Sequence, residues 1–259
     1  MIREINVKEI TRNIKEMCIE ANYTLSPDMD KAMKKAAGEE KSELGTKILN
    51  QLQENLVIAD SEKIPICQDT GMAVVFVDIG QEIHFTGGQL EEAIHEGVRQ
   101  GYTEGYLRKS VVKDPFEREN TKDNTPAIIH YNIVPGDKVK ITVAPKGFGS
   151  ENMSRIFMLK PADGIEGVKN AILTAVKDAG PNACPPVVVG VGIGGTFEKA
   201  ALMAKQALTR PVGTHSEFPS IKAMEEEVLE KVNNLGIGAA GLGGTVTALA
   251  VNINTYPTH

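Results

Sequence analysis

The sequence predicts a mixed α/β fold, in which a helix-rich single domain packs around a small mixed β-sheet. Continuous apolar runs bounded by glycine or proline, such as "MAVVFVDIG" and "PPVVVGVGIGG", are typical of buried strands. Apolar residues at helical spacing cover more of the chain than these runs do. The 259 residues contain no repeat and no low-complexity linker, so residues 1–259 are expected to form one catalytic domain.

The N-terminal half is expected to hold helices on either side of a strand. Four residues that share one helical face predict the first helix: Ile10, Ile14, Met17 and Cys18. A second helix is expected to begin after "SPD" and to run past Leu52. The apolar run at residues 72–80 predicts a buried strand. Apolar residues at helical spacing then predict another helix: Leu90, Ala93, Ile94, Val98 and Tyr102.

The C-terminal half alternates strands and helices. "AIIHYNIV" and "KVKITVAP" flank "PGD", which predicts a β-hairpin. A helix over "GIEGVKNAILTAVKDAG" is followed by a loop and the strand of "PPVVVGVGIGG". Two more helices are expected over "TFEKAALMAKQAL" and "SIKAMEEEVLEKVNNLG". The glycine-rich "GIGAAGLGGT" then leads into a last strand, "VTALAVNI".

Composition and charge exclude several classes of function. The net charge is −6 and the basic residues are dispersed, so neither nucleic acid nor an anionic membrane is expected as a partner. No run reaches the ~18 apolar residues of a membrane span, and the start "MIREINVKEI" lacks the apolar core of a signal peptide. An odd count of three cysteines argues against a disulfide framework. We therefore expect a cytoplasmic protein whose reduced thiols are free to bind metal.

Two of the cysteines lie in matching sequence contexts. Cys67 in "IPICQDTG" and Cys184 in "PNACPP" each stand in a loop just before a predicted strand, beside prolines that restrict the backbone. Thiolates on stiff loops suit a metal ion or an iron–sulfur cluster. The alternative is that both are ordinary buried cysteines, which are common. Cys18 is different, because its place on an apolar helical face predicts a packing role.

The segment "GVGIGGT", residues 190–196, resembles part of a dinucleotide-binding fingerprint, because glycines at a strand–turn–helix junction expose backbone amides to phosphate. That fingerprint belongs to the first strand of a βαβ unit, whereas this segment lies late in the chain. A complete nucleotide site is therefore not expected. Anion binding by the amides and close packing of the helix on the strand both remain open.

A third candidate segment is "APKGFGSENMS", residues 144–154. Lys146, Gly147, Gly149 and Ser150 combine a cation, flexible amides and a hydroxyl, which suits a carboxylate or phosphate oxygen. The spacing is not that of a P-loop, so ATP hydrolysis has no support. Arg108 in "GYLRKSVVKDP" is a further candidate, since a guanidinium group can grip a carboxylate with two parallel hydrogen bonds.

Six segments, in chain order, resemble one family. These are "PICQDTG", "LRKSVVKDP", "KGFGSENMS", "VGVGIGGTFEKA", "LGIGAAGLGGTVTALAV" and "YPTH". They match the α-type region of class I fumarate hydratases and L-tartrate dehydratases, which are iron–sulfur hydro-lyases. The resemblance implies a [4Fe-4S] cluster and, at this chain length, the two-subunit type in which a separate β subunit completes the enzyme. It also implies a C4 dicarboxylate substrate and an α2β2 assembly that contains a homodimer of α chains.

The resemblance also implies roles for individual residues. Cys67 and Cys184 match two of the three cysteines that hold the cluster. Gln68 and Asp69 match residues on the substrate side. Arg108 matches a carboxylate-binding arginine, and Gly147 and Gly149 match residues that contact the substrate through their backbone. His259 matches an active-site histidine. Asp69 and His259 are expected to form a pair that handles protons, since a neighbouring charge tunes the pKa of histidine.

Some expectations depart from the family pattern. The third cysteine ligand is expected beyond His259, in a natural chain that continues past the given sequence. Phe148 stands where many relatives have glycine, which is expected to influence substrate preference. Hydration of fumarate to (S)-malate is the predicted reaction, and dehydration of L-tartrate is the alternative. A nucleotide-binding module and a cluster-free regulatory subunit remain as distant alternatives.

Overall fold

The computed structural model describes residues 2–259, and within them the chain folds as two compact units. Unit 1 comprises residues 2–25 and 55–148, and unit 2 comprises residues 26–54 and 149–259. The predicted mixed α/β, helix-rich fold is confirmed. Within the described residues the strands form three small sheets in place of the one predicted. The expectation of one catalytic domain over the whole chain stays a prediction.

Unit 1 combines two helices with strands from both of its chain segments. Its elements are β1 (Arg3–Asn6), α1 (Val7–Tyr23), β2 (Met72–Gly80), β3 (Ile83–Thr86), α4 (Leu90–Glu104), β4 (Ile128–Val134) and β5 (Val139–Lys146). The predicted strand at residues 72–80 is therefore confirmed. The short strands β1 and β3, which pair in parallel, have no counterpart in the sequence predictions.

The main sheet of unit 1 has the order β4-β2-β5, with β2 parallel to β4 and antiparallel to β5. The predicted hairpin is wrong, because β2 lies between the two strands that "PGD" connects. The end of β2 reaches into this connection. The amide of Gly80, the last residue of β2, donates to the Lys138 carbonyl at 2.8 Å, and the amide of Gln81, the next residue, donates to the Val134 carbonyl at 2.8 Å. The mainly apolar β2 is thereby paired on both edges and largely buried, which a two-stranded hairpin would not achieve.

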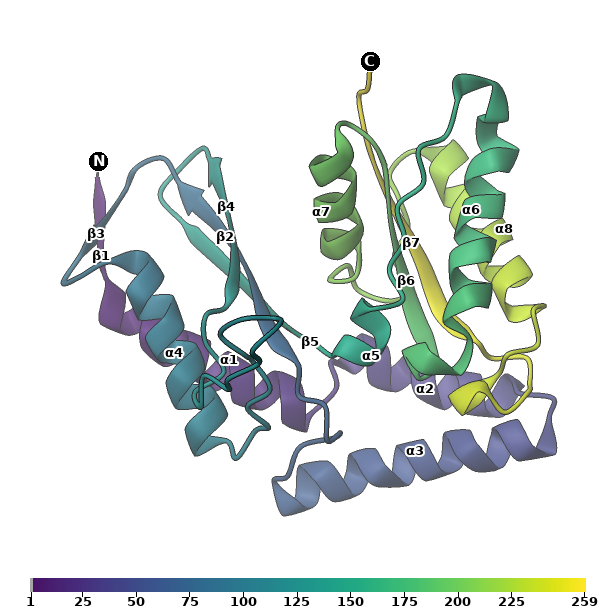
Figure 1. Ribbon diagram of the computed structural model, residues 1–259, viewed down its shortest axis with the longest axis horizontal. Coiled ribbons are helices and arrows are strands. Elements are labelled where there is room, and N and C mark those ends of the chain that lie inside the picture. Colours follow the sequence, from purple (N-terminus) through teal and green to yellow (C-terminus); the bar gives the residue numbers. More distant parts are fainter. Residues whose placement is uncertain (1) are drawn as a thin grey trace. The chain divides into compact units, whose positions relative to one another are not determined.

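Helices α1 and α4 lie side by side and build the core of unit 1 with the sheet (Figure 1). Glycines on α4 allow the close approach, since a Cβ atom at Gly97 would lie 2.7 Å from Cβ of Ile14. The fully buried members of this core come from both helices and from β2, namely Ile14, Cys18, Ala73, Val75, Val77, Ile94, Val98 and Tyr102. The predicted packing role of Cys18 is confirmed.

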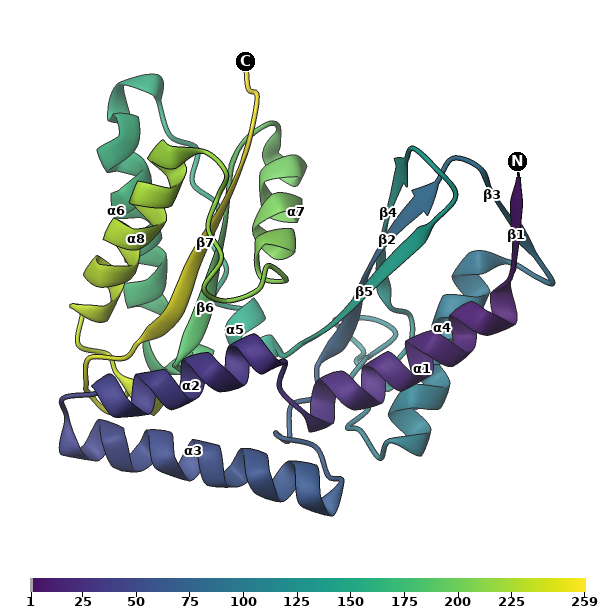
Figure 2. The same ribbon diagram turned by 180° about the vertical axis from the view of Figure 1, so that it is seen from behind.

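Unit 2 is built on a two-stranded parallel sheet. Its longer elements are α2 (Pro27–Glu39), α6 (Gly164–Ala179), β6 (Val187–Gly194), α7 (Phe197–Ala207), α8 (Pro219–Asn233) and β7 (Ala248–Tyr256). Strands β6 and β7 pair in parallel. Helix α7 covers one face of this sheet, and α6 and α8 cover the other (Figure 1 and Figure 2). The three helices and two strands predicted for this part of the sequence are confirmed.

The second predicted helix is wrong in its extent. It is divided into α2 and α3 (Glu43–Glu62) by a break at Glu40, whose backbone is extended at φ −63° and ψ 133°. The Glu40 carboxylate accepts hydrogen bonds from the amides of Lys41 and Ser42, which stops the helix by competing for its backbone groups. Residues 43–54 of α3 belong to unit 2 and residues 55–62 to unit 1, and the short α5 (Phe148–Glu151) likewise spans the boundary.

Among the described residues, we find no helix whose length and apolar character would let it cross a membrane.

Candidate functional site

The loop that carries Cys67 leads from α3 into β2 and is anchored just before the cysteine. The Ile66 amide donates to the Asn22 carbonyl at 2.9 Å, and the Asn55 side chain donates to the Ile66 carbonyl at 2.9 Å. Cys67 itself is exposed, so the alternative that it is an ordinary buried cysteine is wrong. Its thiol lies 3.3 Å from Oε1 of Gln68 and accepts a contact from the Asp69 amide at 3.5 Å. Cys67, Gln68 and Asp69 are thus grouped around one sulfur atom.

The Asp69 carboxylate joins this turn to the glycine segment after β5. One oxygen accepts the Gly71 amide at 3.1 Å, and the other accepts the Phe148 amide at 2.9 Å. A Cβ atom at Gly147 would lie 3.1 Å from Oδ2 of Asp69, so glycine permits the close approach. Two residues predicted from separate motifs, Asp69 and Gly147, therefore lie together in unit 1.

Arg108 belongs to the same group through its backbone. The Thr70 hydroxyl donates to the Arg108 carbonyl at 3.0 Å, and the Tyr102 hydroxyl donates to the Thr70 carbonyl at 2.7 Å. The Arg108 side chain is exposed. Within residues 2–259 its guanidinium group has neither a hydrogen-bond nor an ion-pair partner in the protein. This arginine is therefore available to an acidic ligand.

Asn124 connects the loop that contains Gly71 to the loop that contains Ser110 and Val111, and the sequence analysis did not identify it. Its side chain is fully buried and donates to the Gly71 carbonyl at 3.0 Å. Its oxygen accepts the amides of Ser110 at 2.8 Å and Val111 at 3.2 Å. The available signal was an asparagine within the loop "KDNTP", a residue type that bonds to backbone groups and tolerates its observed φ of +63°. Tyr102 was predicted only as part of an apolar helix face.

In unit 2, Cys184 ends a single 3₁₀ turn, η2 (Gly180–Ala183), that precedes β6. The cysteine is exposed, and its backbone is in the left-handed helical region at φ 56° and ψ 62°. Its amide donates to the Pro181 carbonyl at 3.0 Å. The alternative of a buried cysteine is therefore wrong here too. A Cβ atom at Gly149 would lie 3.0 Å from the Asn182 carbonyl oxygen, so Gly149 lies against the turn that carries Cys184.

His259 is exposed and follows β7. The segment before it is fixed against the turn after β6: the Gly195 amide donates to the Pro257 carbonyl at 3.2 Å, and the Thr258 hydroxyl donates to the Gly195 carbonyl at 3.2 Å. Asp69 belongs to unit 1 and His259 to unit 2, so their predicted pairing stays a prediction.

The glycines of "GVGIGGT" serve helix packing. A Cβ atom at Gly190 would lie 2.3 Å from the Ala204 carbonyl oxygen, and one at Gly192 would lie 2.1 Å from the Ala200 carbonyl oxygen. Side chains at these positions would push α7 off β6. The Gly195 amide, at the turn itself, is already bonded to Pro257. Of the two possibilities left open by the sequence, these contacts favour packing over anion binding.

The chemistry of the three thiols bears on an iron–sulfur cluster. Cys67 and Cys184 are exposed on loops and fit the role of thiolate ligands. Cys18 does not fit, because burial raises the pKa of its thiol to about 12 and keeps it protonated. Among residues 2–259 no group of three or more histidine, cysteine, aspartate or glutamate side chains could hold a metal ion alone.

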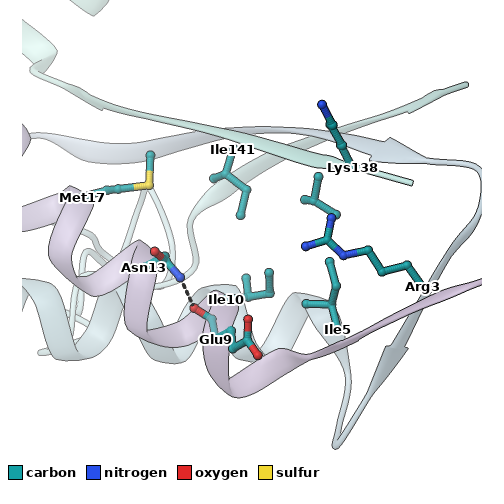
Figure 3. Close-up of a pocket in the computed structure, with 9 residues that line it drawn as sticks. Arg3, Ile5, Glu9, Ile10, Asn13, Met17, Lys138 and Ile141 are labelled. Atoms are coloured by element: carbon teal, nitrogen blue, oxygen red, sulfur yellow. Dashed lines mark hydrogen bonds between the residues drawn. The ribbon is translucent and has the colours of Figure 1, made fainter. Parts of the chain in front are cut away.

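A separate pocket of about 480 Å³ lies in unit 1 between α1 and the strands β1 and β5. It is lined by the apolar residues Ile5, Ile10 and Ile141 and by two basic residues, Arg3 and Lys138 (Figure 3). No predicted site residue lines it. This pocket is therefore separate from the loop of unit 1 that carries Cys67.

Comparison with known proteins places the chain in a family. The model of the family described as "Fumarate hydratase (Fumerase)" matches residues 11–259. A protein of Methanocaldococcus jannaschii, provisionally named L(+)-tartrate dehydratase subunit alpha, is 43% identical over 257 residues, covering 97% of this chain and 90% of that protein. The L(+)-tartrate dehydratase subunit alpha of Escherichia coli strain UTI89 is 31% identical over 269 residues, covering 100% of this chain and 88% of that protein.

These matches define the chain first as a hydro-lyase of the α-subunit type. It belongs to the fumarate hydratase (Fumerase) family, as the six sequence segments predicted. The matches do not distinguish fumarate from tartrate as the substrate, since the family carries one name and the relatives the other.

Proposed function

We propose that the chain is the α subunit of a [4Fe-4S]-dependent hydro-lyase that reversibly adds water to a C4 dicarboxylate, with fumarate and (S)-malate as the substrate pair. The observation that carries the proposal is the grouping of three segments of unit 1 in a chain that belongs to this family. These segments carry Cys67, Gln68 and Asp69, the Arg108 backbone, and Gly147. In the reaction, a hydroxyl group joins one carbon of the double bond and a proton joins the other.

Arg108 is proposed to bind a substrate carboxylate. Its guanidinium group is exposed and has no partner among the described residues, so binding a dicarboxylate breaks no existing ion pair. Two parallel N–H donors also suit a carboxylate better than a point charge does. The hydrogen bond from the Thr70 hydroxyl to the Arg108 carbonyl fixes the position from which this side chain extends.

Asp69 and His259 are proposed to handle the proton. The Asp69 carboxylate accepts two backbone N–H groups, which hold it in place and leave lone pairs for a further donor. A carboxylate beside a histidine stabilises the protonated ring, so the pair can take a proton from carbon and return it.

Cys67 and Cys184 are proposed to supply two thiolates to the cluster. Their exposure and loop positions support this role. The chemistry that a bound [4Fe-4S] cluster supplies is Lewis-acid activation of water or hydroxyl at an iron that lacks a protein ligand. The Asp69 amide contacts the Cys67 sulfur at 3.5 Å and so helps to hold this side chain in place.

A separate β subunit is proposed to complete the enzyme, in a cytoplasmic α2β2 assembly. The support is that the two relatives described above are each named as subunit alpha. Dehydration of L(+)-tartrate to oxaloacetate is a second candidate reaction, which the names of the same relatives favour. Both substrates are C4 dicarboxylates, so the roles proposed for Arg108 and Asp69 hold for either.

The test is an anaerobic assay of the α chain after reconstitution with iron and sulfide, with and without its β subunit, on fumarate, (S)-malate and L(+)-tartrate. We expect negligible turnover by the α chain alone and restored turnover when the β subunit is added. Preference for tartrate would select the second candidate. Full turnover by the α chain alone would contradict the two-subunit proposal. Absence of cluster and of turnover on all three acids would favour a cluster-free regulatory subunit.

A further inference from the structure

Unit 2 contains a buried carboxylate that the proposed chemistry does not use. Glu40 is 9% exposed and, within residues 2–259, has no cationic side chain as partner. A buried charge is costly unless hydrogen bonds satisfy it. Two of the donors are amides next to Glu40 in the chain, those of Lys41 (2.8 Å) and Ser42 (2.9 Å). The other donors lie about 200 residues away in the sequence.

The distant donors belong to the glycine-rich loop that precedes β7. The Thr245 amide donates to both carboxylate oxygens, at 2.8 and 3.0 Å, and the Thr245 hydroxyl donates at 3.0 Å. The Val246 amide adds a bond of 2.9 Å. A Cβ atom at Gly244 would lie 2.8 Å from Oε2 of Glu40, so the loop closes around the carboxylate and has no room for a side chain there.

The same loop contacts the turn that carries Cys184. The Ala240 amide donates to the Pro185 carbonyl at 2.8 Å, directly after the cysteine. A Cβ atom at Gly241 would lie 2.3 Å from Cβ of Pro181, so the backbone of the loop lies against the start of the turn. Ala240 and Cys184 both have positive φ, at 53° and 56°, which is an unfavourable conformation that surrounding contacts must maintain.

We propose that Glu40 is a positioning residue for Cys184: its carboxylate holds the glycine-rich loop of residues 238–247, and that loop holds the left-handed turn that presents the thiol. The inference deepens the proposed function, on which it rests for the role of the thiol as a ligand. Glutamate is required because both of its oxygens accept N–H groups, whereas one end of a glutamine side chain is itself a donor. The amides that face the carboxylate outweigh the effect of burial and lower the pKa of Glu40.

The experiment compares the apo chain with the variant Glu40→Gln by hydrogen–deuterium exchange. Glu39→Gln is the matched control, because Glu39 is the exposed neighbour on α2. In Glu40→Gln we expect amide exchange to accelerate about tenfold in peptides covering residues 238–247 and 180–187, the change that loss of one charge-assisted hydrogen bond gives. Peptides covering β2 should be unchanged. Faster exchange in residues 238–247 with no change in residues 180–187 would overturn the inference.

Thiol labelling gives a second readout on the same chain. Under native conditions the rate at which Cys184 reacts with iodoacetamide should differ between Glu40→Gln and the parent chain, because the exposed thiol is no longer held in one orientation by its turn. Cys67 is the internal reference in unit 1, and the buried Cys18 reports global unfolding. An unchanged ratio of the Cys184 rate to the Cys67 rate would overturn the inference. If Glu40→Gln does not fold, Thr245→Val removes one hydroxyl donor and should give the same changes, smaller.

Hydrogen–deuterium exchange and thiol labelling do not need the cluster. The role of Glu40 can therefore be refuted while the proposed function stands, and the proposed function can be refuted while the role of Glu40 stands. A third readout joins them. After reconstitution with iron and sulfide in the presence of the β subunit, Glu40→Gln should show reduced visible cluster absorption per chain. Glu39→Gln should match the parent chain. Suppose that the turn before Cys184 exchanges faster in Glu40→Gln but the variant still shows full cluster absorption. Cluster binding would then not require a fixed turn, and the inference would be overturned.

Discussion

The two exposed cysteines are held in different ways. In unit 1, the turn after Cys67 is fixed by side chains from other elements, namely the hydroxyl of Tyr102 and the amide of Asn124. In unit 2, the turn before Cys184 is fixed mainly by backbone contacts with a glycine-rich loop, and the side chains of Glu40 and Asn233 accept hydrogen bonds from amides of this loop. Loss of a polar side chain should therefore destabilise the turn after Cys67. The turn before Cys184 should be destabilised by a side chain added at a glycine of the loop that contacts it.

The largest expected effect concerns chemistry on the unit 1 turn. Asp69→Asn keeps the shape of the side chain but removes its charge, so kcat should fall by roughly 10²–10⁴ with little change in KM, the range of general acid–base catalysis. The visible absorption of the reconstituted enzyme should be retained, because Asp69 is not a proposed ligand. Steady-state kinetics of the two-subunit enzyme check this. Normal turnover with an intact cluster would remove Asp69 from the proposed chemistry.

Loss of Asn124 tests the side-chain brace. Asn124→Ala leaves the Gly71 carbonyl and the amides of Ser110 and Val111 without their partner in a buried place, which should cost roughly 2–4 kcal/mol of stability. Urea unfolding of the apo chain measures it. Asn132→Ala is the control, since Asn132 is exposed on β4 and should change stability by less than about 1 kcal/mol. Equal costs for both variants would contradict the brace.

A gain of one methyl group tests the backbone-held turn. Gly241→Ala places a Cβ atom 2.3 Å from Pro181 at a φ of +74°, so overlap and strain together should cost roughly 2–3 kcal/mol. Gly213→Ala is the control: its φ is +88° but no atom lies within 4 Å of the added carbon, so strain alone should cost about 1 kcal/mol. A smaller loss of stability in Gly241→Ala than in Gly213→Ala would contradict the proposed contact with the Cys184 turn.

Arg108→Lys should have the smallest effect. The charge is kept, but the two-pronged grip on a carboxylate is lost, so KM should rise about tenfold with kcat nearly unchanged. Lys109→Arg, at the neighbouring position, is the control and should leave both constants unaltered. A fall in kcat without a change in KM would place Arg108 in the chemical step.

Local signals predicted much of this molecule, and long-range partners account for what was missed. The glycine-bounded apolar run gave β2 at its observed bounds, and proline-rich context pointed to two cysteines that prove to be exposed. The hairpin prediction failed because a turn signal cannot reveal a third strand inserted between its two arms. Glu40 bonds to Thr245 across 205 positions of sequence, so no local pattern identifies it as a buried acid.

The central claim is that the two differently held turns supply thiolates to one cluster, and cluster assembly tests it most directly. The parent chain and the variants Cys67→Ser, Cys184→Ser and Cys18→Ser would each be reconstituted anaerobically with iron and sulfide beside the β subunit. Visible absorption and hydro-lyase activity would be measured on the same samples. We expect Cys67→Ser and Cys184→Ser to lose both signals and Cys18→Ser to keep both. Retention of cluster and activity by Cys67→Ser or Cys184→Ser, or their loss in a folded Cys18→Ser chain, would contradict the account.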